Sequence, residues 1–254
     1  MGTLQQKRLV RDLPPFSVDT TVCGDCLIGK QTREVIPKVS KWRASEVLEL
    51  IHSDICSPIT LSSYTDKRYM LSFIDDYSRK AWLYLLSEKS QALEKFKEFK
   101  NAFNNFCKEY GIKRQLTTRF TPQQNGVAER KNQTVIGMII TLIASKNMPK
   151  MFWAEAAMWS FYVLNRSPSK ALTDTTLEEA WSGSKPTVEH FRVWRSLAHV
   201  HVPKEKRIKL DDRSFPCVLT GMNEEYKAYI LIDPKSMKVV VSKDVVFEEH
   251  KARD

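Results

Sequence analysis

Two carboxylates, Asp54 and Glu129, have the clearest potential for chemistry in this sequence. Asp54 lies in an apolar run that predicts a β-strand, where a carboxylate is costly unless it is paired, hydrogen-bonded or bound to a cation. Glu129 opens a predicted helix, where free N–H groups and the helix dipole favour negative charge. Such a pair suits a divalent-metal site for phosphodiester chemistry with Mg²⁺ or Mn²⁺. Alternatively, Asp54 is a hydrogen-bonded strand residue and Glu129 a helix-start charge.

The elements that must position this pair follow from hydrophobic periodicity. Strands are predicted at 49–55, 69–74 and 81–86, and the turn at 75–79 joins the last two as a hairpin. Asp75 and Asp76 lie on that turn, where side-chain-to-backbone hydrogen bonding is the expected role. A stripe at helical spacing then comprises Phe96, Phe99, Phe103, Phe106 and Tyr110. A strand at 114–118 and helices at 127–145 and 150–165 follow, and short strands make a basic all-β unit at 193–247.

Composition narrows the class of protein. The chain has 254 residues and a net charge of +10, which favours polyanionic partners such as nucleic acid. No apolar run approaches the roughly 20 residues that span a bilayer, so no membrane partner is expected. The basic, polar N-terminus does not read as a secretory signal. Five cysteines are an odd number, which favours a reducing compartment over a disulfide framework.

Several segments, in order along nearly the whole chain, resemble copia-type retrotransposon integrases. The most specific is Pro-Gln-Gln-Asn-Gly-Val-Ala-Glu at 122–129. The others are at 52–56, 73–80, 110–112, 130–132, 152–156, 165–168, 179–181 and 242–247. The resemblance implies an α/β, RNase H-like integrase core, a mixed sheet with flanking helices, followed by a small SH3-like all-β domain. We therefore predict three regions: a remnant of a zinc-binding module at 1–44, the core at 45–182 and the SH3-like domain at 187–250.

The family uses an Asp, Asp, Glu metal triad, and the resemblance assigns Asp54 to the first position and Glu129 to the last. The second Asp has no counterpart, because no Asp occurs between Asp76 and Glu129. A whole strand is expected to be missing near 102–103, so that two helices fuse into one long helix across this junction. The Mg²⁺ or Mn²⁺ site would then be incomplete and weak, and catalysis would fall by orders of magnitude.

Two further groups of residues are interpreted through the same resemblance. Cys23 and Cys26 match the second half of the integrase zinc module, but no His precedes His52, so only a half site for Zn²⁺ remains. Five basic residues are predicted to contact DNA phosphates without reading sequence: Lys113, Arg114, Arg119, Arg130 and Lys131. Arg195 stands where the family usually has Gly, a costly replacement if the backbone there needs a positive φ.

Three functional hypotheses remain open at this stage. The chain is a catalytically defective integrase relative that binds DNA non-specifically. Alternatively, it is an active DNA-joining enzyme, with a substitute carboxylate (Asp75 or Asp76) or with the missing strand supplied by a partner subunit. A third possibility is a non-catalytic protein that forms homo-oligomers or associates with intact integrases. The family implies the nucleus as its location, and otherwise the cytoplasm.

Overall fold

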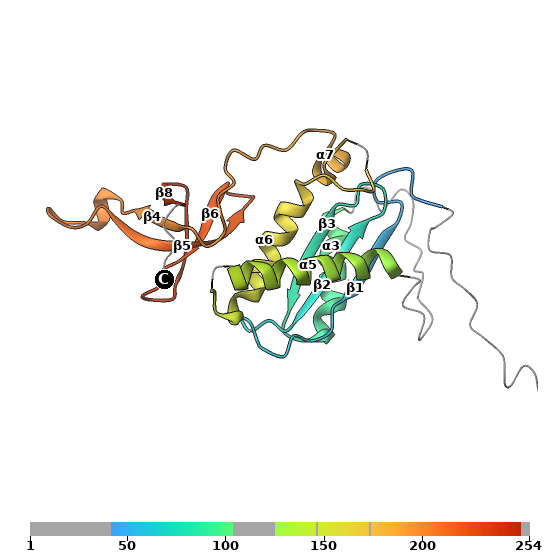
Figure 1. Ribbon diagram of the computed structural model, residues 1–254, viewed down its shortest axis with the longest axis horizontal. Coiled ribbons are helices and arrows are strands. Elements are labelled where there is room, and N and C mark those ends of the chain that lie inside the picture. The colour runs from blue at the N-terminus through green and yellow to red at the C-terminus, as the bar shows by residue number, and fades with distance from the viewer. Residues whose placement is uncertain (1–41, 104–124, 146, 173, 250–254) are drawn as a thin grey trace, which may run out of the picture. The chain divides into compact units, whose positions relative to one another are not determined.

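The computed structural model describes residues 42–103, 125–145, 147–172 and 174–249 (Figure 1). Several predictions therefore lie outside the described residues. They concern Cys23 and Cys26, the strand at 114–118, and the basic residues Lys113, Arg114 and Arg119.

A three-stranded antiparallel sheet forms the centre of the first half. Its strands are β1 (Ile51–Ile55), β2 (Tyr69–Asp75) and β3 (Ala81–Leu86), in the order β1-β2-β3. Both predicted hairpin strands are confirmed to within one residue. The register pairs Asp54 with Ser72 and Phe73 with Trp82. The predicted absence of a further strand stays a prediction, because residues 104–124 are not described.

The two faces of this sheet carry different halves of the core, because side chains alternate along each strand. Met70 and Ile74 face α5 (Gly126–Ser145) and α6 (Trp153–Asn165). Leu71 and Phe73 instead pack with Phe99 of α3 (Ala92–Ala102). Figure 1 shows α5 and α6 on one side of the strands and α3 on the other. This is a mixed α/β arrangement, as the sequence predicts.

The predicted continuous helix across residues 102–103 is wrong at that junction. Helix α3 ends at Ala102, and Phe103 adopts a non-helical backbone with φ −116°. Two consecutive Asn residues follow in the sequence, and Asn has a low helix propensity. Tertiary packing also favours the break, because the Phe103 ring packs against the rings of Trp82, Phe99 and Trp181.

The helices after residue 125 agree closely with the predicted spans. Helix α5 begins one residue before the predicted start, and a 3-10 turn, η3 (Lys150–Phe152), precedes α6. A short helix, α7 (Leu177–Ser182), was not predicted. Its signals are local: the Thr176 side chain accepts a hydrogen bond from Glu179 N, and Gly183 ends the helix with φ 72°.

The second half is an antiparallel five-stranded sheet in the order β7-β6-β5-β4-β8. Its strands are β4 (Leu197–His201), β5 (Ser214–Asn223), β6 (Ala228–Ile232), β7 (Val239–Ser242) and β8 (Val245–Glu248), with a 3-10 turn η4 (Lys204–Lys206) after β4. The first and last strands are neighbours, and the rest form a meander. The predicted all-β unit of short strands at 193–247 is confirmed.

The core continues from α6 into this sheet. Trp159 of α6 shares one buried cluster with Trp194 and with Leu219 of β5. An ion pair of 2.6 Å between Arg166 and Glu224 lies at the same contact. Within the described residues, no helix is long and apolar enough to cross a bilayer.

Candidate functional site

Asp54 lies on the face of the three-stranded sheet that α5 covers. It pairs in register with Ser72, a buried hydroxyl between Leu71 and Phe73, the two residues that face α3. Asp54 itself is half-buried. A carboxylate in this half-buried position needs polar partners, and the helix above it has to supply them.

Asn132 of α5 supplies such a partner. Its Nδ2 donates a hydrogen bond of 2.9 Å to Asp54 Oδ2. Its Oδ1 accepts a hydrogen bond of 3.1 Å from the Ser72 hydroxyl. The amide is buried, with 6% of its surface exposed. Ser72, Asn132 and Asp54 therefore form a continuous relay between strand and helix.

Glu129 lies in the first turn of α5, three residues before Asn132. Residues three apart share a helix face, so Glu129 projects close to the face that meets Asp54. The start of the helix is also fastened to β1, because Asn125 Nδ2 donates to the Ser53 carbonyl at 2.9 Å. The two asparagines thus bracket Glu129 and hold its turn against residues 53 and 54.

Asp75 is occupied by structural hydrogen bonds. It is fully buried, its Oδ1 accepts from Leu48 N, and its Oδ2 accepts from both the amide and the hydroxyl of Ser78, all at 2.7 Å. The side-chain-to-backbone role predicted for this turn is confirmed. No carboxylate oxygen of Asp75 is left over for a metal ion.

Asp76 is held in a second polar cluster. Its Oδ2 accepts from Ala44 N at 2.9 Å, and its Oδ1 lies 2.9 Å from His52 Nε2 and 2.6 Å from Arg79. Burial raises the pKa of Asp76, but the Ala44 hydrogen bond, the His52 hydrogen bond and the Arg79 charge together lower it below its ordinary value. Asp76 is thus kept ionised by structural partners.

The remaining carboxylates fit one weakly held ion better than a full two-metal centre. Mg²⁺ accepts one or two carboxylates together with water and phosphate oxygens, so Asp54 and Glu129 suit a hydrated ion. In the part of the chain that the structure describes, no three His, Cys, Asp or Glu side chains gather closely enough to hold a metal. The third carboxylate of a triad is not found there.

Two of the predicted phosphate-binding residues are described, and they differ in environment. Arg130 is exposed, and its guanidinium lies over the first turn of α5, near Gly126. Lys131 is half-buried, and burial together with the charge of Arg79 lowers its pKa to about 8. Both residues directly follow Glu129 in the sequence, so this end of α5 combines one acidic and two basic groups.

Sequence reasoning missed Ser72, Asn125 and Asn132. The available signal was the spacing of the two asparagines around Glu129, four residues before it and three after it, which places all three near one helix face. The contact with Asp54 itself depends on packing between distant segments, and no local pattern reveals it.

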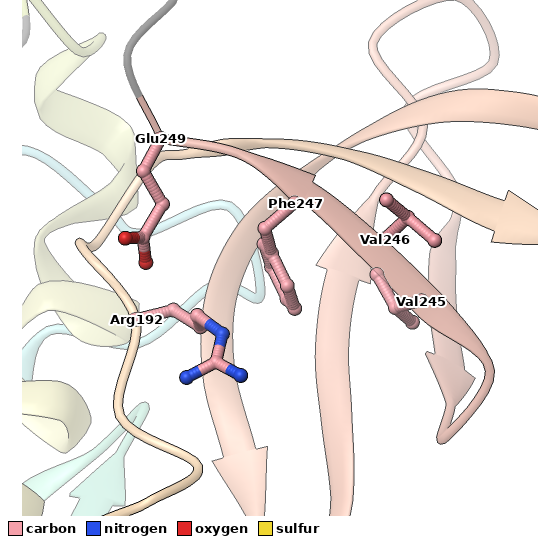
Figure 2. A pocket seen from close by; sticks show the side chains of 5 residues that line it. All are labelled: Arg192, Val245, Val246, Phe247 and Glu249. Carbon is pink, nitrogen blue, oxygen red and sulfur yellow. The ribbon is translucent and has the colours of Figure 1, made fainter.

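A shallow pocket of about 360 Å³ lies elsewhere, on the five-stranded sheet. Figure 2 shows its lining: Arg192, Glu249 and three residues of β8, namely Val245, Val246 and Phe247. The Arg192 guanidinium is 5.6 Å from the Phe247 ring centre and donates to the carbonyls of Glu189 and Phe191. The pocket shares no residue with the Asp54 site.

Comparison with known proteins adds independent findings. Residues 196–254 match the family of the retroviral polymerase SH3-like domain. A retrovirus-related Pol polyprotein from transposon TNT 1-94 of Nicotiana tabacum is 36% identical over 283 residues, covering 100% of this chain and 21% of the polyprotein. The polyproteins from transposons RE1 and RE2 of Arabidopsis thaliana are each 28% identical, covering 90% and 89% of this chain and 17% of each polyprotein.

A solved structure, the simian T-cell lymphotropic virus intasome in complex with PP2A regulatory subunit B56 gamma, contains a chain with a TM-score of 0.46 and 13% identity to this one. The match covers 89% of this chain and 87% of that chain.

This chain spans about a fifth of the length of the Pol polyproteins that it matches. The SH3-like match falls on the five-stranded sheet, which begins at Leu197. The homologues of this chain are retrovirus-related Pol polyproteins of plant copia-type transposons, and the chain fits their integrase region, with a retroviral polymerase SH3-like domain at its C-terminal end.

Proposed function

We propose that this chain is an integrase-related protein that binds DNA through the phosphate backbone and is defective in metal-dependent DNA joining. The carboxylate set is the observation that carries this proposal. Asp54 and Glu129 are held on adjoining elements, whereas the carboxylate oxygens of Asp75 and Asp76 accept structural hydrogen bonds. For this reason, the alternative in which Asp75 or Asp76 replaces the missing carboxylate of an active enzyme loses support.

The alignment with the tobacco polyprotein also supports a shortened site. It extends over 283 residues, although this chain has 254. The alignment must therefore contain positions where the relative has a residue and this chain has none. A segment carrying the second Asp would be one such position under the proposal.

Asp54 and Glu129 would hold Mg²⁺ or Mn²⁺, which when bound polarises a phosphate oxygen and activates the attacking hydroxyl or water. The residues of this chain would position the ion only from two sides. Without a third carboxylate, the developing charge on the phosphate would be poorly compensated, so joining would fall by orders of magnitude. The zinc half site at Cys23 and Cys26, nuclear location and oligomer formation remain part of the proposal as predicted from the sequence.

DNA binding is proposed from charge. The chain carries a net charge of +10, and Arg130 and Lys131 directly follow Glu129 on α5. Phosphate contacts of this kind position a duplex and carry no sequence information. Lys113, Arg114 and Arg119 would extend the same contact.

Fluorescence anisotropy with two duplexes of unrelated sequence tests the binding part. Affinity should be similar for both duplexes and should fall steeply between roughly 50 and 200 mM salt, because condensed counterions are released on binding. Arg130→Ala should weaken both complexes and reduce the salt slope by about 1. Lys185→Ala, an exposed cation outside the site, is the matched control. Salt-independent binding, or a strong preference for one duplex, would contradict the proposal.

A further inference from the structure

The loop between β4 and β5 carries apolar and basic side chains that the candidate site does not use. Ile208 and Leu210 are 77% and 103% exposed, more than any other large apolar side chain among the described residues. We propose that this loop binds the acidic groove of a nuclear-import receptor, an inference that rests on the nuclear location in the proposed function. The basic side chains of the loop are Lys204, Lys206, Arg207, Lys209 and Arg213.

The basic core of the loop is the run Lys206-Arg207-Ile208-Lys209, which contains no acidic residue. Short runs rich in Lys and Arg are typical of nuclear-import signals and of nucleic-acid patches. Lys206 and Lys209 are exposed, and Arg207 is half-buried with an extended backbone of φ −139° and ψ 149°. A groove lined with carboxylates can therefore approach this run from solvent and pair with its cations.

The charge pattern of the loop favours an acidic protein over DNA as its partner. Residues 204–213 contain five positive side chains, but also the carboxylates of Glu205, Asp211 and Asp212. A phosphate backbone repels these carboxylates, and it offers no apolar surface to the exposed Ile208 and Leu210 side chains. A protein groove can present acidic groups to the basic run and apolar groups to these two side chains.

The turn at the tip of the loop holds Leu210 in a strained backbone conformation. The Asp211 amide donates to the Ile208 carbonyl at 3.2 Å, and the Ile208 amide donates to Asp211 Oδ2 at 2.8 Å. Leu210, between them, has a φ of 79°, in the left-handed region that is unfavourable for leucine. Its side chain is fully exposed and gains no packing in return. Binding in an extended conformation would release this strain and would break only the hydrogen bonds of the turn.

Titration of the fluorescently labelled full chain with a purified armadillo-repeat import receptor, whose repeats form an extended concave groove, measures the binding. The loop variant should bind about tenfold more weakly, because charge-assisted contacts are lost. The control variant loses the same charge and should stay within about twofold of the parent, because distant surface charges are screened by salt. The loop variant combines Lys206→Ala, Arg207→Ala and Lys209→Ala, and the control variant combines Lys235→Ala, Lys238→Ala and Lys243→Ala, which replace three exposed lysines beside β7.

Two single substitutions separate the strain of the turn from its charge. Asp211→Ala removes the side-chain acceptor of the turn. Asp212→Ala removes the same charge from the neighbouring residue, whose carboxylate accepts no hydrogen bond among the described residues. Asp211→Ala should bind the receptor about threefold more tightly than Asp212→Ala, because the open loop is populated more often. Equal affinities of the two variants would contradict release of strain on binding.

Nuclear accumulation of the full chain, fused to a carrier too large to cross nuclear pores unaided, and DNA affinity complete the test. Loss of accumulation in the loop variant alone, with DNA affinity equal to that of the control variant, would support the inference. Equal receptor affinity of the loop and control variants would overturn it, as would a selective loss of DNA affinity, which would assign the loop to DNA. Exclusion of the parent chain from the nucleus would contradict the proposed location and leave the proposed DNA binding intact.

Discussion

At the scale of single residues, burial and partners decide which carboxylates remain available for chemistry. Asp75 and Asp76 are adjacent to each other and more buried than Asp54, and their hydrogen bonds join the turn to the segment before β1 and to His52 of β1. Among the described residues, the Asp54 carboxylate accepts one hydrogen bond, from the Asn132 amide to Oδ2. The candidate site is thus defined by the carboxylate that structural hydrogen bonds do not fully occupy.

Replacing Asp76 tests its structural role. Because the folded state lowers its pKa, the stabilisation from this carboxylate is fully present above the unfolded pKa of about 3.9 and is lost as the pH falls through the lower folded pKa. Asp76→Asn should lower the free energy of unfolding by about 2 kcal/mol at pH 7. Urea denaturation at pH 7 and near pH 3 measures this, and a penalty that is as large at the acidic pH would refute it.

Arg195 gives a second test at this scale. Its φ of 66° lies in the left-handed region, as the departure from the family's Gly suggests, and its amide is fixed by a hydrogen bond to Leu219 O. A side chain in that conformation costs about 1–2 kcal/mol, part of which glycine's greater chain entropy offsets. Arg195→Gly should therefore raise the free energy of unfolding by about 1 kcal/mol.

Arg213→Gly is the control for Arg195→Gly, because Arg213 has an ordinary negative φ and should only lose stability. Thermal and chemical denaturation compare the two variants directly. A loss of stability in both would show that the backbone at Arg195 is not under the strain described.

At the scale of elements, the sequence predicted what local periodicity controls and failed where distant packing decides. Strands β2 and β3 were predicted correctly because their apolar residues alternate between the two faces of the sheet, and each face packs in a core cluster. The end of α3 was missed because Phe103 leaves the helical stripe to pack on Trp82 and Trp181. The bond from Asn132 to Asp54 joins residues 78 positions apart, so the need for a partner could be predicted but its identity could not.

Helix α6 carries a half-buried carboxylate whose removal should be favourable. Glu155 Oε2 is buried and has no hydrogen-bond partner among the described residues. Burial raises the pKa of Glu155 above its ordinary value of 4.5, although a hydrogen bond from its own backbone amide opposes this. The folded state therefore binds the proton more tightly, and stability is lost as the pH rises from about 4.5 through the raised folded pKa.

Glu155→Gln should accordingly raise the free energy of unfolding by about 1 kcal/mol at pH 7, because the unpaired charge is removed. The gain should disappear near pH 3, where the parent side chain is protonated in both states. Melting temperatures at the two pH values measure this difference. Destabilisation at pH 7 would mean that the charged carboxylate has a partner that the structure does not reveal.

At the scale of the whole molecule, the α/β part and the SH3-like sheet share one buried cluster. Trp159 packs with Trp194 and Leu219, Arg166 stacks 3.8 Å from the Tyr162 ring centre, and Tyr229 donates to the His190 carbonyl. Parts that share a continuous core unfold together, because neither can expose its side of the interface alone.

Differential scanning calorimetry should thus show one cooperative transition for residues 42–249. Trp159→Ala removes the large side chain from the shared cluster and should separate the trace into two transitions, while Trp42→Ala, an exposed tryptophan, should not. Two transitions in the unmodified chain would contradict a shared core.

This chain fits the integrase region of transposon Pol polyproteins, and we propose that its carboxylate set is incomplete. The most direct measurement is a DNA strand-transfer assay with Mn²⁺, run on the chain and on Asp54→Asn, under salt conditions where DNA binding has been verified. We predict DNA binding by both proteins and no joined product from the chain above the level of Asp54→Asn. Joined product that requires Mn²⁺ and disappears with Asp54→Asn would show that the site is complete after all.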